Sequence, residues 1–324
     1  MNRYFKIENT PLALSGIALG LTSLSILWDA HGIKYVKAAA VCVSLVVLCL
    51  VFIKILLNPK KLLNELEDPA IGSLSFTVPM LIMLLSSVIK SEYRTLALCI
   101  WLCGIILYLI NLILFMILSS SIFKFENVLP SWFTPAVGIC LVVTTGKQYN
   151  FDVFYEIVFF YSLTWLLLLL PIIVYRTLYY KPRLKKSQVM TLAVFAAPAN
   201  LCLAAYLDLF KTGGILFILL LGISHLLTSF VYILLPYLLS RPFTYSFAAL
   251  TFPLSIGAVA SNKLLKILIK FNSSWVFAYQ IVFYMQLMVA TIVVGYVIYK
   301  TIEQGVKSGV ESINRSIKNE MGQY

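Results

Sequence analysis

Few ionisable side chains lie within the long apolar runs of this sequence. Asp152 and Glu156 stand near the start of one run and His225 lies inside another, whereas Asp29 and Asp208 stand at the ends of runs. Carboxylates and imidazoles at membrane depth carry protons in coupled transporters. Asp152, Glu156 and His225 therefore offer a proton path for a carrier, although an interhelical hydrogen bond is the favoured role for His225.

Other chemistry lacks the residues to perform it. The sequence contains no P-loop, no GxSxG or HExxH motif and no paired carboxylates, so an enzyme is not expected. The six cysteines fall inside apolar runs without CxxC spacing, and the chain has only two histidines. This pattern predicts neither a metal site nor a cofactor.

Five prolines recur at intervals of roughly one helical hairpin. They are Pro11, Pro79, Pro135, Pro198 and Pro253, separated by 68, 56, 63 and 55 residues. Proline inside a helix removes a backbone hydrogen bond and kinks the segment. At membrane depth such a defect persists only where protein or a water-filled cavity satisfies the freed carbonyl. We therefore expect the five segments to gather around a shared axis. Two further prolines, Pro171 and Pro236, lie in apolar segments outside this set of five.

Small and hydroxyl-bearing residues accompany these prolines. The candidates for lining an enclosed space are Ser15, Gly16, Thr77, Thr134 and Ser255. Polar groups or water must accompany an ion there, because an unpaired ion in a medium of low dielectric costs on the order of tens of kcal/mol. The alternative role is helix packing, in which the hydroxyls bond the backbone of their own helices. The sequence leaves both roles open.

The composition shows which elements must position these residues. Hydrophobic residues make up 61% and charged residues 12% of 324 positions, whereas soluble domains carry about 45–50% and about 25%. A bilayer core of about 30 Å needs about 20 apolar residues per helix. Ten stretches are long enough or nearly so: 11–28, 36–57, 71–89, 95–118, 131–146, 153–175, 189–210, 213–239, 243–261 and 275–299. The predicted fold is an all-α polytopic membrane protein with one transmembrane domain over residues 1–299.

The even-numbered stretches differ from the odd-numbered ones that carry the prolines. Val41–Leu57 is almost entirely aliphatic, and Trp165–Leu170 reads WLLLLL. Large aliphatic side chains without polar interruption are typical of a lipid-facing helix. The alternation therefore predicts an inner ring of odd helices around a central pore, enclosed by an outer ring of even helices.

The basic residues lie between the apolar runs. The net charge is +12, yet a nucleic-acid-binding protein would cluster its bases on one water-facing stripe, so nucleic acid is not an expected partner. Counted by side, with Lys37 and Lys54 of stretch 36–57 assigned to its nearer ends, the side that contains both termini holds 16 Lys and Arg residues and the other side holds 9. The positive-inside rule then predicts cytoplasmic termini in a multi-pass cell-membrane protein, and no cleavable signal peptide is expected.

A polar tail follows the last apolar stretch. From Lys300 onward, apolar residues recur at helical spacing: Ile302, Val306, Val310, Ile313 and Ile317. This spacing predicts a short amphipathic helix on the membrane surface within a cytoplasmic tail, residues 300–324.

Four short motifs carry a family resemblance. They are Pro11–Gly20 (PLALSGIALG), Trp132–Gly138 (WFTPAVG), Ala197–Ala199 (APA) and Thr251–Ser255 (TFPLS). In this order the chain resembles the tellurite-resistance/dicarboxylate transporter family, which includes bacterial TehA-like proteins and the slow anion channels of plant guard cells. The resemblance implies ten helices as five helical hairpins with quasi-fivefold symmetry, an hourglass pore in each protomer and a homotrimer.

The resemblance also implies a gate. A phenylalanine plugs the pore in this family, and the matching residue is Phe252, directly before Pro253; Phe247 is the second candidate. The implied function is an anion channel for chloride or nitrate. Positive pore mouths and weak anion hydration would have to provide selectivity, because carbonyls freed at kinks attract cations. The alternative is a proton-coupled secondary transporter of dicarboxylates or tellurite, which would use Asp152, Glu156 or His225.

Overall fold

The computed structural model describes residues 10–89, 93–121, 124–210 and 213–321, with the side chains described as far as residue 307. These residues form helices and no strand. The α-helices are α1 (Leu14–Ala30), α2 (Lys34–Leu57), α3 (Pro59–Leu66), α4 (Pro69–Leu74), α5 (Thr77–Ile89), α6 (Arg94–Ser121), α7 (Phe133–Val137), α8 (Leu141–Gly146), α9 (Asp152–Leu178), α10 (Ala196–Leu209), α11 (Gly214–Leu239), α12 (Ala248–Lys270) and α13 (Val276–Met321). The 3₁₀ turns are η2 (Phe125–Asn127), η3 (Pro130–Trp132), η4 (Gly138–Cys140), η5 (Lys147–Tyr149), η6 (Val189–Phe195) and η7 (Tyr245–Phe247). Arg3 and Lys6, part of the predicted cytoplasmic N-terminus, lie outside the described residues.

The helices are those of a polytopic membrane protein. Within the described ranges, eight helical stretches are long and apolar enough to cross a bilayer. Two other expected stretches look different. Helix α1 is apolar but only 17 residues long, and the stretch 131–146 is divided among η3, α7, η4 and α8.

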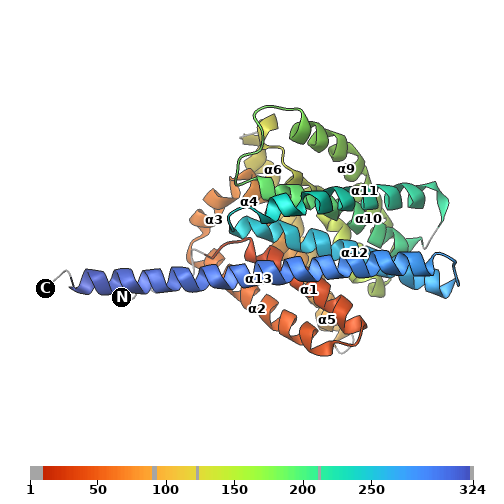
Figure 1. Ribbon diagram of the computed structural model, residues 1–324, viewed down its shortest axis with the longest axis horizontal. Helices are drawn as coiled ribbons and strands as arrows, with labels where there is room; N and C mark the ends of the chain where they lie inside the picture. Colours follow the sequence, from red (N-terminus) through yellow and green to blue (C-terminus); the bar gives the residue numbers. More distant parts are fainter. Residues whose placement is uncertain (1–9, 90–92, 122–123, 211–212, 322–324) are drawn as a thin grey trace.

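Burial separates central helices from peripheral ones. In the most apolar window of α2, α6, α9, α11 and α13, 28–39% of the residues are buried, against 67–94% in the stretches 69–89, 189–209 and 245–270. Helix α1 packs against α12, α5 and α2, and α10 packs against α12 and α11. Figure 1 shows α10 and α12 near the middle of the bundle, α2 and α9 at opposite edges, and α13 crossing its front. The long aliphatic helices are therefore peripheral to the stretches that contain Pro79, Pro198 and Pro253.

Helical geometry changes just before the prolines of the central stretches. Helix α4 ends at Leu74 and α5 begins at Thr77, two residues before Pro79. The 3₁₀ turn η6 passes into α10 two residues before Pro198. The ring of proline clashes with the carbonyl four residues earlier and cannot donate to it, so a regular α-helix cannot run through this position unchanged. The stretches of Pro79 and Pro198 are thus divided close to their prolines, whereas Pro253 lies inside the continuous helix α12.

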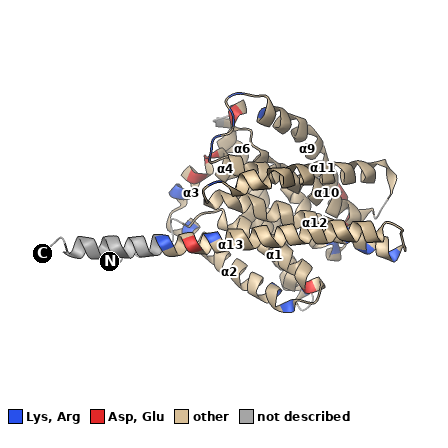
Figure 2. Cartoon of the chain, in the orientation of Figure 1, with Lys and Arg blue, Asp and Glu red and all other residues tan. Residues whose placement is uncertain are grey.

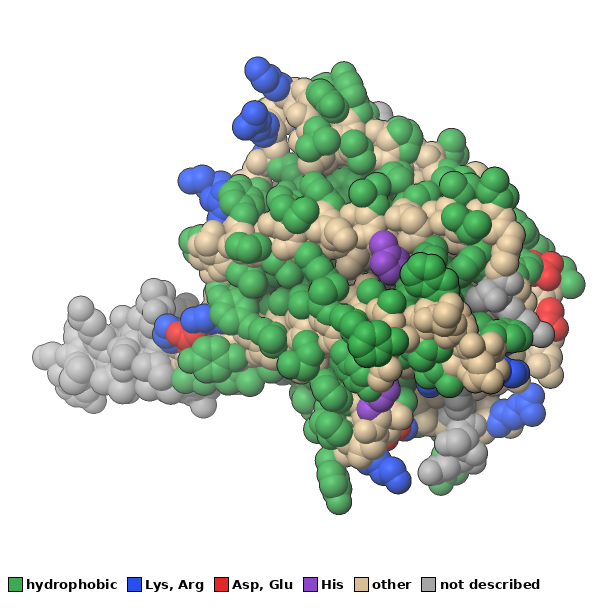
Figure 3. Space-filling model, turned by 45° about the vertical axis from the view of Figure 1, so that its right-hand side comes forward, with side chains coloured by type: hydrophobic (Ala, Val, Ile, Leu, Met, Phe, Trp, Pro, Cys, Tyr) green, Lys and Arg blue, Asp and Glu red, His purple; other side chains and the backbone are tan. Residues whose placement is uncertain are grey.

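The surface fits a bilayer. Figure 3 shows hydrophobic side chains over most of the visible face, and Figure 2 shows charged side chains concentrated toward the ends of the bundle. Many large apolar residues of α2 and α6 are exposed, including Val46, Phe52, Ile106 and Ile113. Contact of such a surface with lipid chains is favourable, whereas its exposure to water costs free energy.

The C-terminal tail continues the last transmembrane helix. Helix α13 runs without a break from Val276 to Met321 and extends beyond the bundle (Figure 1). Ile302 and Val306 are both exposed, while the side chains of Val310, Ile313 and Ile317 lie outside the described set. The tail is thus helical as its spacing predicts, but it is joined to the span because no proline interrupts residues 276–321.

Helices α1 and α12 approach each other closely, although they are far apart in sequence. The Thr251 hydroxyl donates to the carbonyl oxygen of Gly16 at 2.8 Å, and the Ser255 hydroxyl donates to that of Gly20 at 3.0 Å. A Cβ on Gly20 would lie 2.6 Å from the Cβ of Thr251 and 2.7 Å from its carbonyl carbon. Glycine is therefore required where these two backbones meet.

We predict that Gly20→Ala destabilises the bundle by about 1–3 kcal/mol, because the added methyl group forces α1 away from α12. The measurement is the unfolding midpoint of purified protein in detergent. Gly222→Ala on α11 is the matched control, since a Cβ there meets nothing within 4 Å. An unchanged midpoint for Gly20→Ala would show that the two helices separate without cost.

Candidate pore

A narrow cavity of about 40 Å³ lies among the central helices. Every proline-bearing stretch contributes to its wall. The lining residues are Ala13, Gly16, Leu74, Thr77, Met80, Phe133, Thr134, Val137, Gly138, Val194, Ala197, Pro198, Leu201, Ala248, Ala249, Phe252 and Pro253. This lining is almost entirely apolar and contains no charged side chain.

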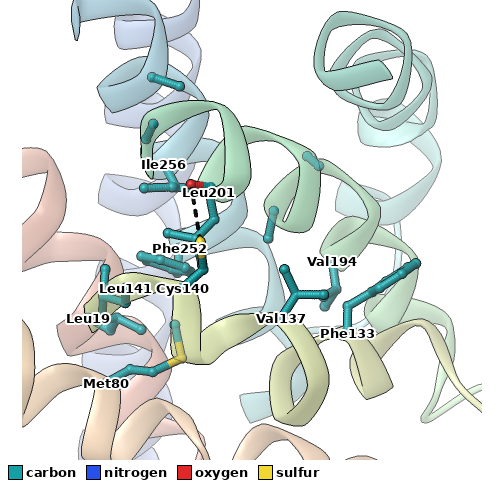
Figure 4. Packing of buried hydrophobic residues seen from close by; sticks show 14 of the residues in the cluster. Leu19, Met80, Phe133, Val137, Cys140, Leu141, Val194, Leu201, Phe252 and Ile256 are labelled. Carbon is teal, nitrogen blue, oxygen red and sulfur yellow. Dashed lines mark hydrogen bonds between the residues drawn. The ribbon is translucent and has the colours of Figure 1, made fainter. Parts of the chain in front are cut away.

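Phe252 lies in this wall on the second turn of α12. Its side chain is only 6% exposed. In Figure 4 the ring lies beside Cys140, Leu141 and Leu201, which come from two other parts of the chain, the η4–α8 junction and α10. An aromatic ring in so small an apolar space leaves no room there for a hydrated ion.

Phe247, the second candidate for a gate, lies elsewhere. It is fully buried and does not line the cavity. Its ring packs 5.1 Å from that of Phe243 and 6.5 Å from that of Tyr296 on α13, measured between ring centres. The geometry therefore places Phe252, but not Phe247, at the cavity.

The small and hydroxyl residues divide between two roles. Gly16, Thr77 and Thr134 line the cavity, whereas Ser15 and Ser255 do not. The hydroxyls of Ser15 and Thr77 lie 2.7 Å apart, and the Ser255 hydroxyl joins α12 to α1. Helix packing thus accounts for the two serines.

The prolines also differ. Pro198 and Pro253 line the cavity, and Pro253 lies inside α12. Pro11 precedes α1, while Pro79 and Pro135 occupy the third positions of α5 and α7 without reaching the cavity wall. Pro11, Pro79 and Pro135 therefore affect the course of the backbone around the cavity, but their side chains do not form its surface.

Several carbonyls near the prolines have hydrogen-bond donors. The hydroxyl of Tyr108 on α6 donates to the carbonyl oxygens of Thr134 at 2.7 Å and of Pro135 at 3.1 Å. The side-chain amide of Asn200 donates to the carbonyl of Ala196 at 2.7 Å. Such bonds supply side-chain donors to carbonyl oxygens beside the prolines.

The ionisable candidates lie away from the cavity. Asp152 and Glu156 are exposed at the start of α9. His225 on α11 is half-buried, with Nδ1 2.9 Å from the carbonyl oxygen of Leu221 and Nε2 3.2 Å from the hydroxyl of Tyr279 on α13. These contacts agree with the interhelical hydrogen bond favoured from the sequence.

Sequence reasoning did not identify the apolar part of the lining. Met80, Val137, Leu201 and Ala248 carry no chemistry that marks them. The sequence signal that could have identified these residues is proximity to a proline, because each lies within five residues of one of the five prolines. Without the bend angles, that distance does not tell which face of a helix points inward.

No curated protein matches the chain. The model of the voltage-dependent anion channel family (SLAC1) matches residues 9–302. This match confirms the resemblance seen in the sequence, and it shows that the chain belongs to the voltage-dependent anion channel family.

Proposed function

We propose that this protein is an anion channel that conducts small monovalent anions, such as chloride and nitrate, through a pore closed by Phe252. One observation carries the proposal: all five proline-bearing stretches contribute to a single cavity, and Phe252 forms part of its wall. Membership of an anion channel family supports the class of ion.

The topology that we propose has ten crossings arranged as five hairpins with quasi-fivefold symmetry. Helix α1 and the divided stretch 130–146 would complete the inner ring with the stretches containing α5, α10 and α12. The burial contrast between central and peripheral helices supports this arrangement. Residues 1–299 form one transmembrane domain in the cell membrane, residues 300–324 and the N-terminus are cytoplasmic, and the protein is a homotrimer by family resemblance.

The preference for anions has two physical sources in this proposal. First, an uncharged lining gives little compensation for lost hydration, so weakly hydrated anions pass at lower cost. Second, the cavity lies at helix N-termini, since Ala13 caps α1, Thr77 begins α5 and Ala248 begins α12. The N-terminal end of a helix carries a partial positive charge of roughly +0.5.

A proton-coupled carrier of dicarboxylates or tellurite is the alternative. It would need a titratable group beside the substrate path. Asp152, Glu156 and His225 do not line the cavity, so the geometry favours the channel.

We predict that Phe252→Ala opens a standing anion leak. Removing the ring widens the constriction, and flux should rise about a hundredfold, which corresponds to a barrier lowered by about 2.7 kcal/mol. The measurement is chloride and nitrate efflux from proteoliposomes, with potassium efflux measured in parallel. Flux at the parent level, or a leak that favours potassium, would contradict the proposal.

Phe247→Ala is the matched control for that experiment. It removes the same side chain five residues earlier, from a ring packed between Phe243 and Tyr296. We expect lower thermal stability without a leak. A comparable leak in both variants would show that loosened packing, rather than an opened constriction, produces the flux.

A second prediction separates the channel from the carrier. In the Phe252→Ala protein, anion current should rise in proportion to voltage, remain unsaturated as anion concentration increases, and show no response to a pH gradient at zero voltage. A passive pore has no cycle to saturate. Saturation together with proton-driven anion movement would instead establish the carrier.

A further inference from the structure

Two charged residues lie on the central helices beyond the cavity. Lys263 of α12 and Asp208 of α10 form an ion pair. Their side chains are 25% and 21% exposed, respectively. A pair of this kind is partly accessible to water, although it lies between two helices whose earlier turns line the cavity.

Helix geometry places both residues on cavity-facing sides. Lys263 follows Ile256 by seven residues, which puts it about 20° away around the axis of α12 and about 10 Å farther along it, on the part of the helix after Pro253. Asp208 follows the cavity-lining residue Leu201 by seven residues, again about 20° away around its own axis. Figure 4 shows Leu201 beside Phe252 and Ile256, and Asp208 pairs with Lys263 seven residues after Leu201 and Ile256, so the two helices run side by side in the same direction.

The position of the ion pair along α10 and α12, relative to the cavity, follows from the residue numbers. The cavity is lined by the first turns of α10 and α12, and the ion pair lies several turns later on the same faces. The pair is therefore on the opposite side of Phe252 from the cavity. In the proposed channel, this position is the far mouth of the passage that α10 and α12 would border.

We infer that the Asp208–Lys263 pair controls the electrostatic potential at this mouth: Asp208 cancels the positive charge of Lys263 and thereby limits the concentration of anions there. The inference rests on the proposed channel function. A single positive charge beside a narrow mouth attracts anions and raises the rate at which they enter. The paired carboxylate removes most of that attraction.

The first test uses anion flux through the Phe252→Ala protein at low ionic strength. Asp208→Asn leaves Lys263 unpaired and should raise chloride flux about threefold, the effect of a unit charge about 6 Å from the ion in water. Lys263→Gln leaves Asp208 unpaired and should lower flux by a similar factor. The double variant should return to the parent rate, and high salt should reduce the differences because it screens the charges.

A second ion pair provides the matched control. Lys37 and Asp29 join α2 to α1 at 2.8 Å, with side-chain exposures of 33% and 27%. Asp29 follows the cavity-lining residue Gly16 by thirteen residues, so it points about 140° away from that face. Asp29→Asn makes the same change in charge and should leave flux unchanged. An equal increase in this control, or lower flux in both Asp208→Asn and Lys263→Gln, would overturn the inference.

A second measurement is independent of flux and keeps Phe252 in place. The Asp208→Cys variant is treated with anionic sulfonatoethyl or cationic trimethylammonium-ethyl methanethiosulfonate, and each rate is divided by that for a small free thiol. The parent protein gives the background from its native cysteines. The anionic reagent should react about threefold faster in relative rate, and Lys263→Gln should abolish this preference.

The two measurements separate the two proposals. If Phe252→Ala carries no anion flux, the channel proposal fails, but the reagent preference still decides whether Lys263 sets a positive potential at an aqueous mouth. If Phe252→Ala conducts and Asp208→Cys shows no charge preference or no reaction, the channel stands and the inference about the ion pair is overturned.

Discussion

The close packing of α1 on α12 is the contact on which the central architecture depends. It joins residues 235 positions apart through the Thr251 and Ser255 hydroxyls, and it requires the missing side chain of Gly20. Phe252 directly follows Thr251, about 100° around the helix. Because Thr251 is held against α1, the orientation of α12 is fixed and the next side chain faces the cavity. The contact that brings the two ends of the chain together thus also positions the proposed gate.

Hydrogen bonding explains how broken helices can surround an apolar space. Each change of helical geometry frees backbone groups that lipid cannot satisfy. Here side-chain groups add donors to carbonyls beside these changes: Tyr108 donates to Thr134, which also accepts from the Gly138 N–H, and Asn200 donates to Ala196. The donors come from the same side chains that join neighbouring helices. The cavity can therefore remain apolar while these carbonyls are paired, and in the proposed channel this pairing would disfavour cations without a fixed charge.

Much of this arrangement could be predicted from sequence, because membrane residence restricts the possible structures. Composition predicts the helices, and the spacing of the five prolines predicts that their stretches meet. Sequence could not distinguish Gly16, which lines the cavity, from its neighbour Ser15, which packs against Thr77. The two positions differ by about 100° around one helix, and proline bends change that angle. The 3₁₀ turns and the division of 130–146 were also missed, since they depend on packing between helices.

The same contacts restrict how a channel of this design could open. Thr251 and Ser255 hold α12 to α1 on both sides of Phe252, and the central glycines leave these helices little space to slide. The side chain of Phe252 is freer than its helix, because the cavity wall near it includes Met80. Methionine is unbranched and adapts its shape at low cost. Pro253 also donates no hydrogen bond to the carbonyl of Ala249, so the backbone beside the ring is locally less constrained. Opening by rotation of the Phe252 ring, with its flexible neighbours moving aside, therefore breaks fewer contacts than opening by movement of α12 as a whole.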